Sequence, residues 1–149
     1  MVDNLKIIQA NLNLNNLGDT VIHACITVAF YCAAKLEEFI ISNICKNFNP
    51  EKYITRQNYS TLTDQHGLPV MEFCLSITKC EPKGKDMQCA PQTSYITNPQ
   101  FALDNHMHLN PAPYNTHLFA CKHPSLAGHI TKLLVIGHTA HLHSVQVRA

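Results

Sequence analysis

Histidine is the residue type that most suggests chemistry in this sequence. Ten histidines are present, and eight of them follow position 100. His138, His141 and His143 lie close together, and the spacing of the first two would place both on one face of a helix. A zinc site needs four such ligands in a fixed arrangement. Because no cysteine lies beside this cluster and no HExxH motif occurs, the sequence favours solvent-facing histidines over a metal site.

Two carboxylates and a lysine are the other candidates for chemistry. Glu37 and Glu38 are neighbours on a predicted helix, so they do not face each other as a catalytic pair, and a solvated helix face is the simpler interpretation. Lys79 ends a predicted strand, where a lysine commonly protects a sheet edge from aggregation. The sequence contains no GxSxG, no phosphate-binding loop and no dinucleotide fingerprint.

Composition narrows the class of protein without naming a partner. Charged residues make up 14% of the chain and the formal net charge is +1, so no strong overall field steers it to nucleic acid. The seven cysteines form no CxxC pair, which favours reduced thiols in an intracellular protein. The longest apolar stretch, residues 21–34, contains His23 and is too short for a bilayer. It is expected to be a buried helix, with no membrane association.

The elements that must position these residues begin with helices. Apolar residues at helical spacing predict a short helix within residues 2–14. A second, long helix should start at a cap on Asp19 or Thr20 and continue to about Asn47. A third is expected over Pro99–Leu109, capped by Thr97 or Asn98 with proline in its first turn.

Between these helices the pattern changes to strands. Residues 69–79 alternate with a period of two, which predicts a strand that buries Met71, Phe73, Leu75 and Ile77. Neighbouring strands are expected over residues 53–63 and 87–90, separated by turns at 64–67 and 81–86. The predicted fold is α+β, mainly helical with a small three-stranded antiparallel sheet.

Five segments of the chain, in this order, resemble the catalytic domain of tyrosine recombinases, the phage-integrase-like enzymes, carried by fungal Crypton-type mobile elements. The resemblance covers Leu5 to Lys132, so residues 1–132 are assigned to a partial catalytic domain and residues 133–149 to a divergent tail. It implies a partial DNA breaking-rejoining core. The segments read IIQANLNLNNLGDTVIHACITVAFYCAAKLEEF, NPEKYITRQNYS, LSITKCEPKGKD, NPQFALDNHMHLNPAPYNTHLFACKH and HITK.

The resemblance implies a chemistry that needs no cofactor and no metal. In this family a tyrosine attacks a DNA phosphate and becomes covalently linked to it. Two arginines and a histidine stabilise the charge that builds on the phosphate oxygens. A lysine on a turn of the sheet protonates the departing oxygen as a general acid. DNA is the partner that the resemblance implies, with recombination and integration as the role.

Carried over residue by residue, three positions match the catalytic set. Lys35 occupies the place of the first arginine, Glu38 that of its acidic partner, and Lys79 that of the sheet lysine. Lys35 keeps the positive charge but lacks the planar five-donor guanidinium.

The rest of the catalytic set does not match. The chain has no H-x-x-R motif, and its two arginines, Arg56 and Arg148, lie away from the catalytic positions. All five tyrosines precede the region where the nucleophile should lie. The sequence therefore predicts a truncated, degenerate, inactive member, intracellular and by family resemblance nuclear. A non-enzymatic interaction remnant and a relic reading frame without selected function remain the alternatives.

Overall fold

A computed structural model describes residues 2–40, 49–75, 83–89, 92 and 96–121. The helices are α1 (Val2–Ala10), α2 (Leu17–Tyr31), α3 (Leu36–Phe39) and α4 (Pro99–Leu109), with a 3-10 turn, η1, at Arg56–Asn58. The strands β1 (Tyr59–Thr63), β2 (Pro69–Leu75) and β3 (Lys85–Cys89) form one antiparallel sheet in the order β1-β2-β3. The α+β class and the small three-stranded sheet are therefore confirmed.

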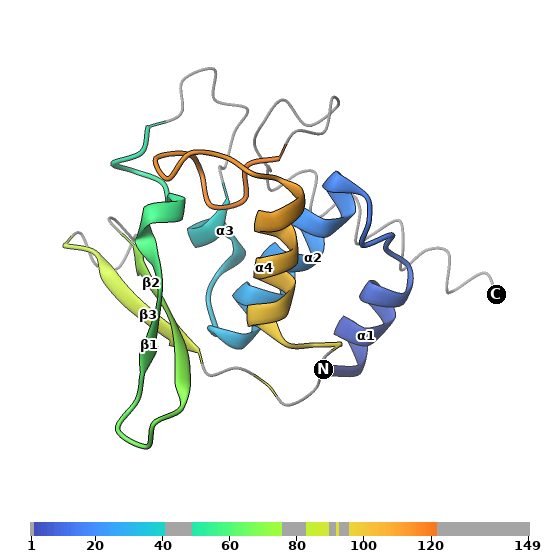
Figure 1. Ribbon diagram of the computed structural model, residues 1–149, viewed down its shortest axis with the longest axis horizontal. Helices are drawn as coiled ribbons and strands as arrows, with labels where there is room; N and C mark the ends of the chain where they lie inside the picture. The colour runs from blue at the N-terminus through green and yellow to red at the C-terminus, as the bar shows by residue number, and fades with distance from the viewer. Residues whose placement is uncertain (1, 41–48, 76–82, 90–91, 93–95, 122–149) are drawn as a thin grey trace.

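The helices form one layer and the sheet forms another. Helix α4 packs along α2, the sheet stands on one side of this pair, and α1 lies on the other (Figure 1). Helix α2 is buried over most of its length, as its apolar sequence predicts. None of the helices in the described ranges combines the length and apolar character needed to cross a bilayer.

The sheet faces the helices with the side chains that the period of two predicted. Met71, Phe73 and Leu75 on β2 are buried, and Met87 and Cys89 on β3 continue the same face. Ile77 lies outside the described residues. Aromatic rings join the two layers, because Phe39 of α3 meets Phe73 edge-on with 5.5 Å between ring centroids.

The predicted first strand was too long at its start. Strand β1 begins only at Tyr59, because the residues before η1 pair with a different segment. Leu118 N donates to Ile54 O at 3.0 Å, and Arg56 N donates to Thr116 O at 3.0 Å. Strand β3 also starts earlier than expected, at Lys85 rather than Met87. Compared with the prediction, strand β1 is therefore shorter at its start and strand β3 begins two residues earlier.

The single long helix that the sequence predicted is wrong. Helix α2 ends at Tyr31, and Ala33 takes a left-handed conformation with φ of 50°. Ala34 N donates to Ala29 O at 3.0 Å and Ala33 N to Phe30 O at 3.2 Å, which is the Schellman pattern of a helix end. Glycine normally occupies this left-handed position, and its absence here concealed the break. The second half of the predicted helix is instead the separate α3, and residues 41–48 lie outside the described ranges.

The caps of α2 and α4 follow simple side-chain rules. Asn16, rather than the predicted Asp19 or Thr20, caps α2 by accepting from Gly18 N at 2.8 Å and Asp19 N at 3.2 Å. Asn98 caps α4 as predicted, accepting from Gln100 N at 2.9 Å. Each asparagine satisfies amide donors that the first helical turn leaves free.

The turn between β1 and β2 supplies a first testable prediction. Asp64 Oδ1 accepts from His66 N and Leu68 N, both at 2.8 Å, and Gly67 takes φ of +79° with no atom within 4 Å of an added Cβ. Gly67→Ala should therefore lower the free energy of unfolding by about 1 kcal/mol through backbone strain alone. Urea denaturation would measure this, and an unchanged midpoint would contradict it.

Candidate functional site

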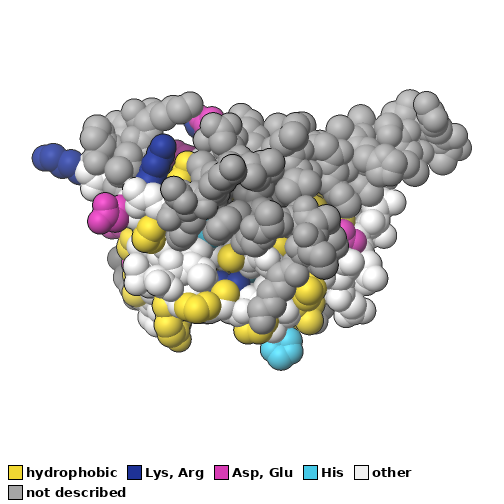
Figure 2. Space-filling view, turned by 90° about the horizontal axis from the view of Figure 1, so that it is seen from above, with side chains coloured by type: hydrophobic (Ala, Val, Ile, Leu, Met, Phe, Trp, Pro, Cys, Tyr) yellow, Lys and Arg dark blue, Asp and Glu magenta, His cyan; other side chains and the backbone are white. Residues whose placement is uncertain are grey.

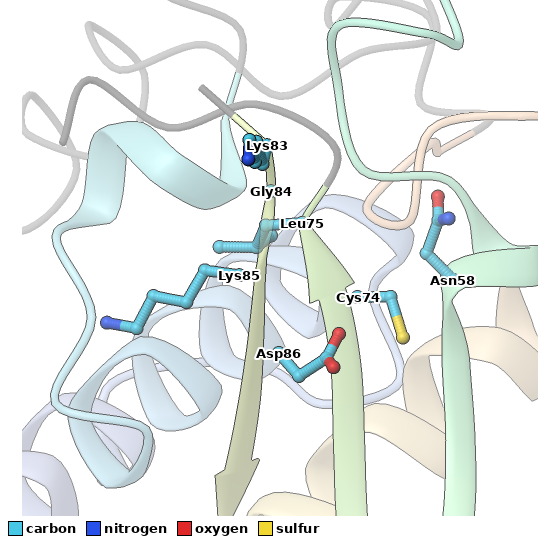
Figure 3. Close-up of a pocket in the computed structure, with 7 residues that line it drawn as sticks. All are labelled: Asn58, Cys74, Leu75, Lys83, Gly84, Lys85 and Asp86. Atoms are coloured by element: carbon cyan, nitrogen blue, oxygen red, sulfur yellow. The ribbon is translucent and has the colours of Figure 1, made fainter. Parts of the chain in front are cut away.

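A hollow of about 300 Å³ lies at the end of the sheet where β2 stops and β3 starts. The strand register sets Cys74 opposite Asp86 and Leu75 opposite Lys85. Figure 3 shows the side chains that surround this hollow, which come from η1, β2 and β3 and from the residues just before β3: Asn58, Cys74, Leu75, Lys83, Gly84, Lys85 and Asp86.

Strand alternation separates the charges at this end of the sheet. Lys85 and Asp86 are consecutive on β3, so their side chains point to opposite faces, as Figure 3 shows. Gly84, with φ of 88°, allows the backbone to enter β3 in a conformation that other residues rarely adopt. Lys83 and Lys85 are both exposed, so their ammonium groups are available to an anion in solvent.

Cys74 lies opposite Asp86 on the neighbouring strand, and its surroundings disfavour the thiolate. Its thiol forms a hydrogen bond with the Asp86 carboxylate across the strand pair. Desolvation of the thiol raises its pKa, and so do this hydrogen bond and the negative charges of Asp86 and Glu72. Reaction needs the thiolate, so these surroundings keep Cys74 unreactive. Asp86 is in turn occupied by Cys74 rather than by a lysine.

The structure places Glu38 on α3 and Lys35 at the cap position just before it, not on the long helix that the sequence predicted. Glu38 Oε2 accepts a hydrogen bond from Lys35 N at 3.1 Å, so the carboxylate caps the short helix. Within the described ranges the only ion pair joins Lys6 and Asp3. The Glu38 carboxylate therefore accepts a hydrogen bond from the backbone N–H of Lys35 and forms no ion pair with the Lys35 ammonium group. The exposed Lys35 side chain is left available to a ligand.

Helix α3 and the hollow adjoin the same region of the sheet. Phe39, at the end of α3, packs on Phe73 of β2, and Leu75, two residues further along β2, lines the hollow. Lys79 lies outside the described residues. Leu75 and Lys83, the described residues on either side of it in the sequence, both line the hollow. In the space-filling view, basic side chains project at the end of the molecule that carries the sheet (Figure 2).

Comparison with known proteins adds no relative. No protein-family model, curated protein or solved structure matches this chain. The function of the site is therefore argued from its own residues.

Sequence reasoning missed a buried polar cluster between the end of α4 and the segment that follows it. Arg56 is only 7% exposed, and its Nη2 donates to the backbone carbonyls of Asn110 and Ala120, the latter at 3.3 Å. His106 Nε2 lies 3.1 Å from Leu118 O, and its Nδ1 lies 3.3 Å from the amide nitrogen of Asn110. These contacts tie α4 to the chain after it.

The cluster holds His106 in its neutral form. Burial, helped by the positive charge of Arg56, lowers the pKa of His106 to about 4, although the hydrogen bond to Leu118 O acts in the opposite direction. Because a carbonyl can only accept, Nε2 carries the hydrogen, and Nδ1 accepts from Asn110. Burial also lowers the pKa of Arg56, although a guanidinium remains charged at neutral pH.

Helical spacing could have located His106, but nothing local indicated Arg56. His106 follows Ala102 by four residues and Leu103 by three, so it falls on the buried face of α4. Arg56 is buried only because its segment pairs with residues 114–118, a contact between distant parts of the chain. In the part of the chain that the structure describes, no three His, Cys, Asp or Glu side chains gather as a metal site. His138, His141 and His143 lie outside it.

Proposed function

We propose that this chain is a degenerate tyrosine-recombinase-like domain that holds DNA by its phosphates and does not cut it. The supporting observation is the lysine arrangement at the end of the sheet. Lys83 and Lys85 line a hollow at this end, and α3, which follows Lys35, packs on the same strand.

Local charge supports phosphate contact although the whole chain is nearly neutral. The described part of the hollow has two lysines and one carboxylate, and that carboxylate is hydrogen-bonded to Cys74. Ammonium groups bind phosphates as point charges without reading bases. The expected mode is therefore weak and insensitive to DNA sequence, because no guanidinium fork is available at the position of Lys35.

The available nucleophiles support binding without cleavage. The chain has no H-x-x-R motif to complete a phosphate clamp. Tyr59 is the tyrosine nearest the hollow along the chain, and its hydroxyl accepts from Gln100 Nε2 at 2.6 Å while its ring stacks on Phe73. Catalytic groups that act as a unit lose the reaction when one of them is missing.

Binding to a fluorescent DNA duplex, titrated at several salt concentrations, tests this function. With about three phosphate contacts, affinity should fall roughly 40-fold between 50 and 200 mM salt. The double variant Lys83→Gln/Lys85→Gln should reduce the magnitude of the slope of log affinity against log salt by about 1 to 2. The matched control Lys6→Gln/Lys52→Gln removes two lysines from α1 and from the segment before η1, and should leave the slope unchanged.

Two results would contradict the proposal. One is the absence of any binding at 50 mM salt, and the other is an equal loss of slope in the control variant. The same duplex with a nicked suicide site separates binding from cleavage. A protein–DNA band that survives denaturing electrophoresis would overturn the inactive assignment, since the proposal expects none.

A further inference from the structure

A second cavity, of about 520 Å³, lies between the start of β1 and the end of α4. Its volume falls in the range of sites that bind small organic molecules. Hydroxyl groups and apolar surface share its lining, which includes Arg56, Tyr59, Thr61, Met107, Pro111 and Tyr114. This mixed lining differs from the lysine-rich hollow at the end of the sheet, with which it has no residue in common.

Arg56 brings a positive charge to this cavity that the described residues do not balance. Its side chain is more than nine-tenths buried, and only Nη2 finds acceptors among the described residues, both of them neutral carbonyls. Nε is buried and has no hydrogen-bond partner in the same ranges. A buried charge without a counter-charge is unfavourable, and the carbonyls of Asn110, at the end of α4, and of Ala120 compensate it only in part.

The remaining sequence offers little to neutralise Arg56. Residues 122–149 and 41–48 contain no aspartate or glutamate. Glu81 is the only acidic side chain outside the described ranges, and it belongs to the connection between β2 and β3. The other nine acidic residues are described, and none of them forms an ion pair with Arg56.

We infer that this cavity binds a small organic anion, with its phosphate or carboxylate group on the Arg56 guanidinium. The hydroxyls of Tyr59 and Thr61, 3.3 Å apart on β1, add polar groups to the same lining. Met107 and Pro111 give the body of the ligand an apolar surface. A concave lining of this kind suits a small molecule better than the convex backbone of a duplex.

Isothermal titration with three probes tests the inference on the full chain. Phenyl phosphate and inorganic phosphate share the oxyanion, and benzoate presents a carboxylate on the same ring. Phenyl phosphate should bind at least tenfold more tightly than inorganic phosphate, because only it contacts the apolar lining. A wild-type chain that binds neither phenyl phosphate nor benzoate at millimolar concentration would overturn the inference.

Variants assign the binding to this cavity. Arg56→Gln should weaken phenyl phosphate binding at least tenfold, whereas Lys52→Gln removes an exposed charge and should leave it unchanged. Tyr114→Ala changes an 80% exposed residue of the lining, so it keeps the test decisive if Arg56→Gln does not fold, and it should weaken binding severalfold by removing ring surface from the cavity. Equal binding by Tyr114→Ala and wild type would count against the site.

A competition experiment separates this inference from the proposed DNA contact. Saturating phenyl phosphate should leave the DNA titration unchanged, and Lys83→Gln/Lys85→Gln should bind phenyl phosphate as the wild type does. Displacement of DNA by phenyl phosphate would overturn the inference of a separate small-molecule site. Failure of DNA binding alone would leave the cavity result intact.

Discussion

Replacing Phe73 with alanine should lower the free energy of unfolding by about 3–5 kcal/mol. Phe73 is fully buried at the centre of β2, where its ring stacks on Tyr59 and meets Phe39 edge-on. It therefore joins β1, β2 and α3 at one point. A small domain has a total stability of about 5–15 kcal/mol, so this single change removes a large fraction of it.

Urea denaturation followed by circular dichroism would measure this effect. The matched control is Leu62→Ala on β1, where the side chain is 42% exposed. That change should alter stability by no more than about 0.5 kcal/mol. If the two variants unfold at the same urea concentration, Phe73 does not join the sheet to the helices as described.

Acidification should destabilise the fold through His106 by up to roughly 3 kcal/mol, because a pKa of about 4 lies well below the usual 6.5. The unfolded chain takes up this proton as the pH falls through about 6.5, whereas the folded chain resists until about 4. Stability from this histidine is thus complete above pH 6.5 and is lost progressively down to pH 4. Protonation of Nδ1 would break its contact with Asn110 and add a charge beside Arg56.

Unfolding free energies at pH 7, 5.5 and 4 would check this prediction. His106→Gln should flatten the pH dependence, even though the variant is less stable at every pH. His66→Gln, in the exposed turn between β1 and β2, should leave the dependence unchanged. His23 on α2, whose pKa burial also lowers to about 4, should account for the remaining dependence. A His106→Gln curve parallel to the wild type would contradict the assignment.

The parts of the fold with a strong local pattern were predictable from the sequence. The period of two on β2 identified its buried face, and Asn98 with Pro99 identified the start of α4. The break after α2 was not predictable in the same way, because the left-handed position is an alanine. No helix-ending residue appears there, and the helical pattern continues through it.

The residues of the candidate site were likewise predictable only where a local pattern marks them, and not where distant parts of the chain bring them together. The sequence predicted Lys35 and Glu38 within one long helix, but Lys35 is the cap residue before α3, and the Glu38 carboxylate accepts from its backbone N–H. Lys83 lies in the turn before β3 and Lys85 begins that strand, and only the strand register shows that both border the hollow. Arg56 is buried by a pairing across about sixty residues of chain, which no local pattern encodes.

The left-handed conformation of Ala33 determines where the chain after α2 meets the sheet. Had α2 continued, Phe39 would stand about 12 Å beyond Tyr31 along the helix axis, since each residue adds about 1.5 Å. The reversal instead returns the chain so that the ring of Phe39 reaches Phe73 and Phe119. The contact that Phe39 makes between the helices and the sheet therefore depends on the left-handed backbone of Ala33.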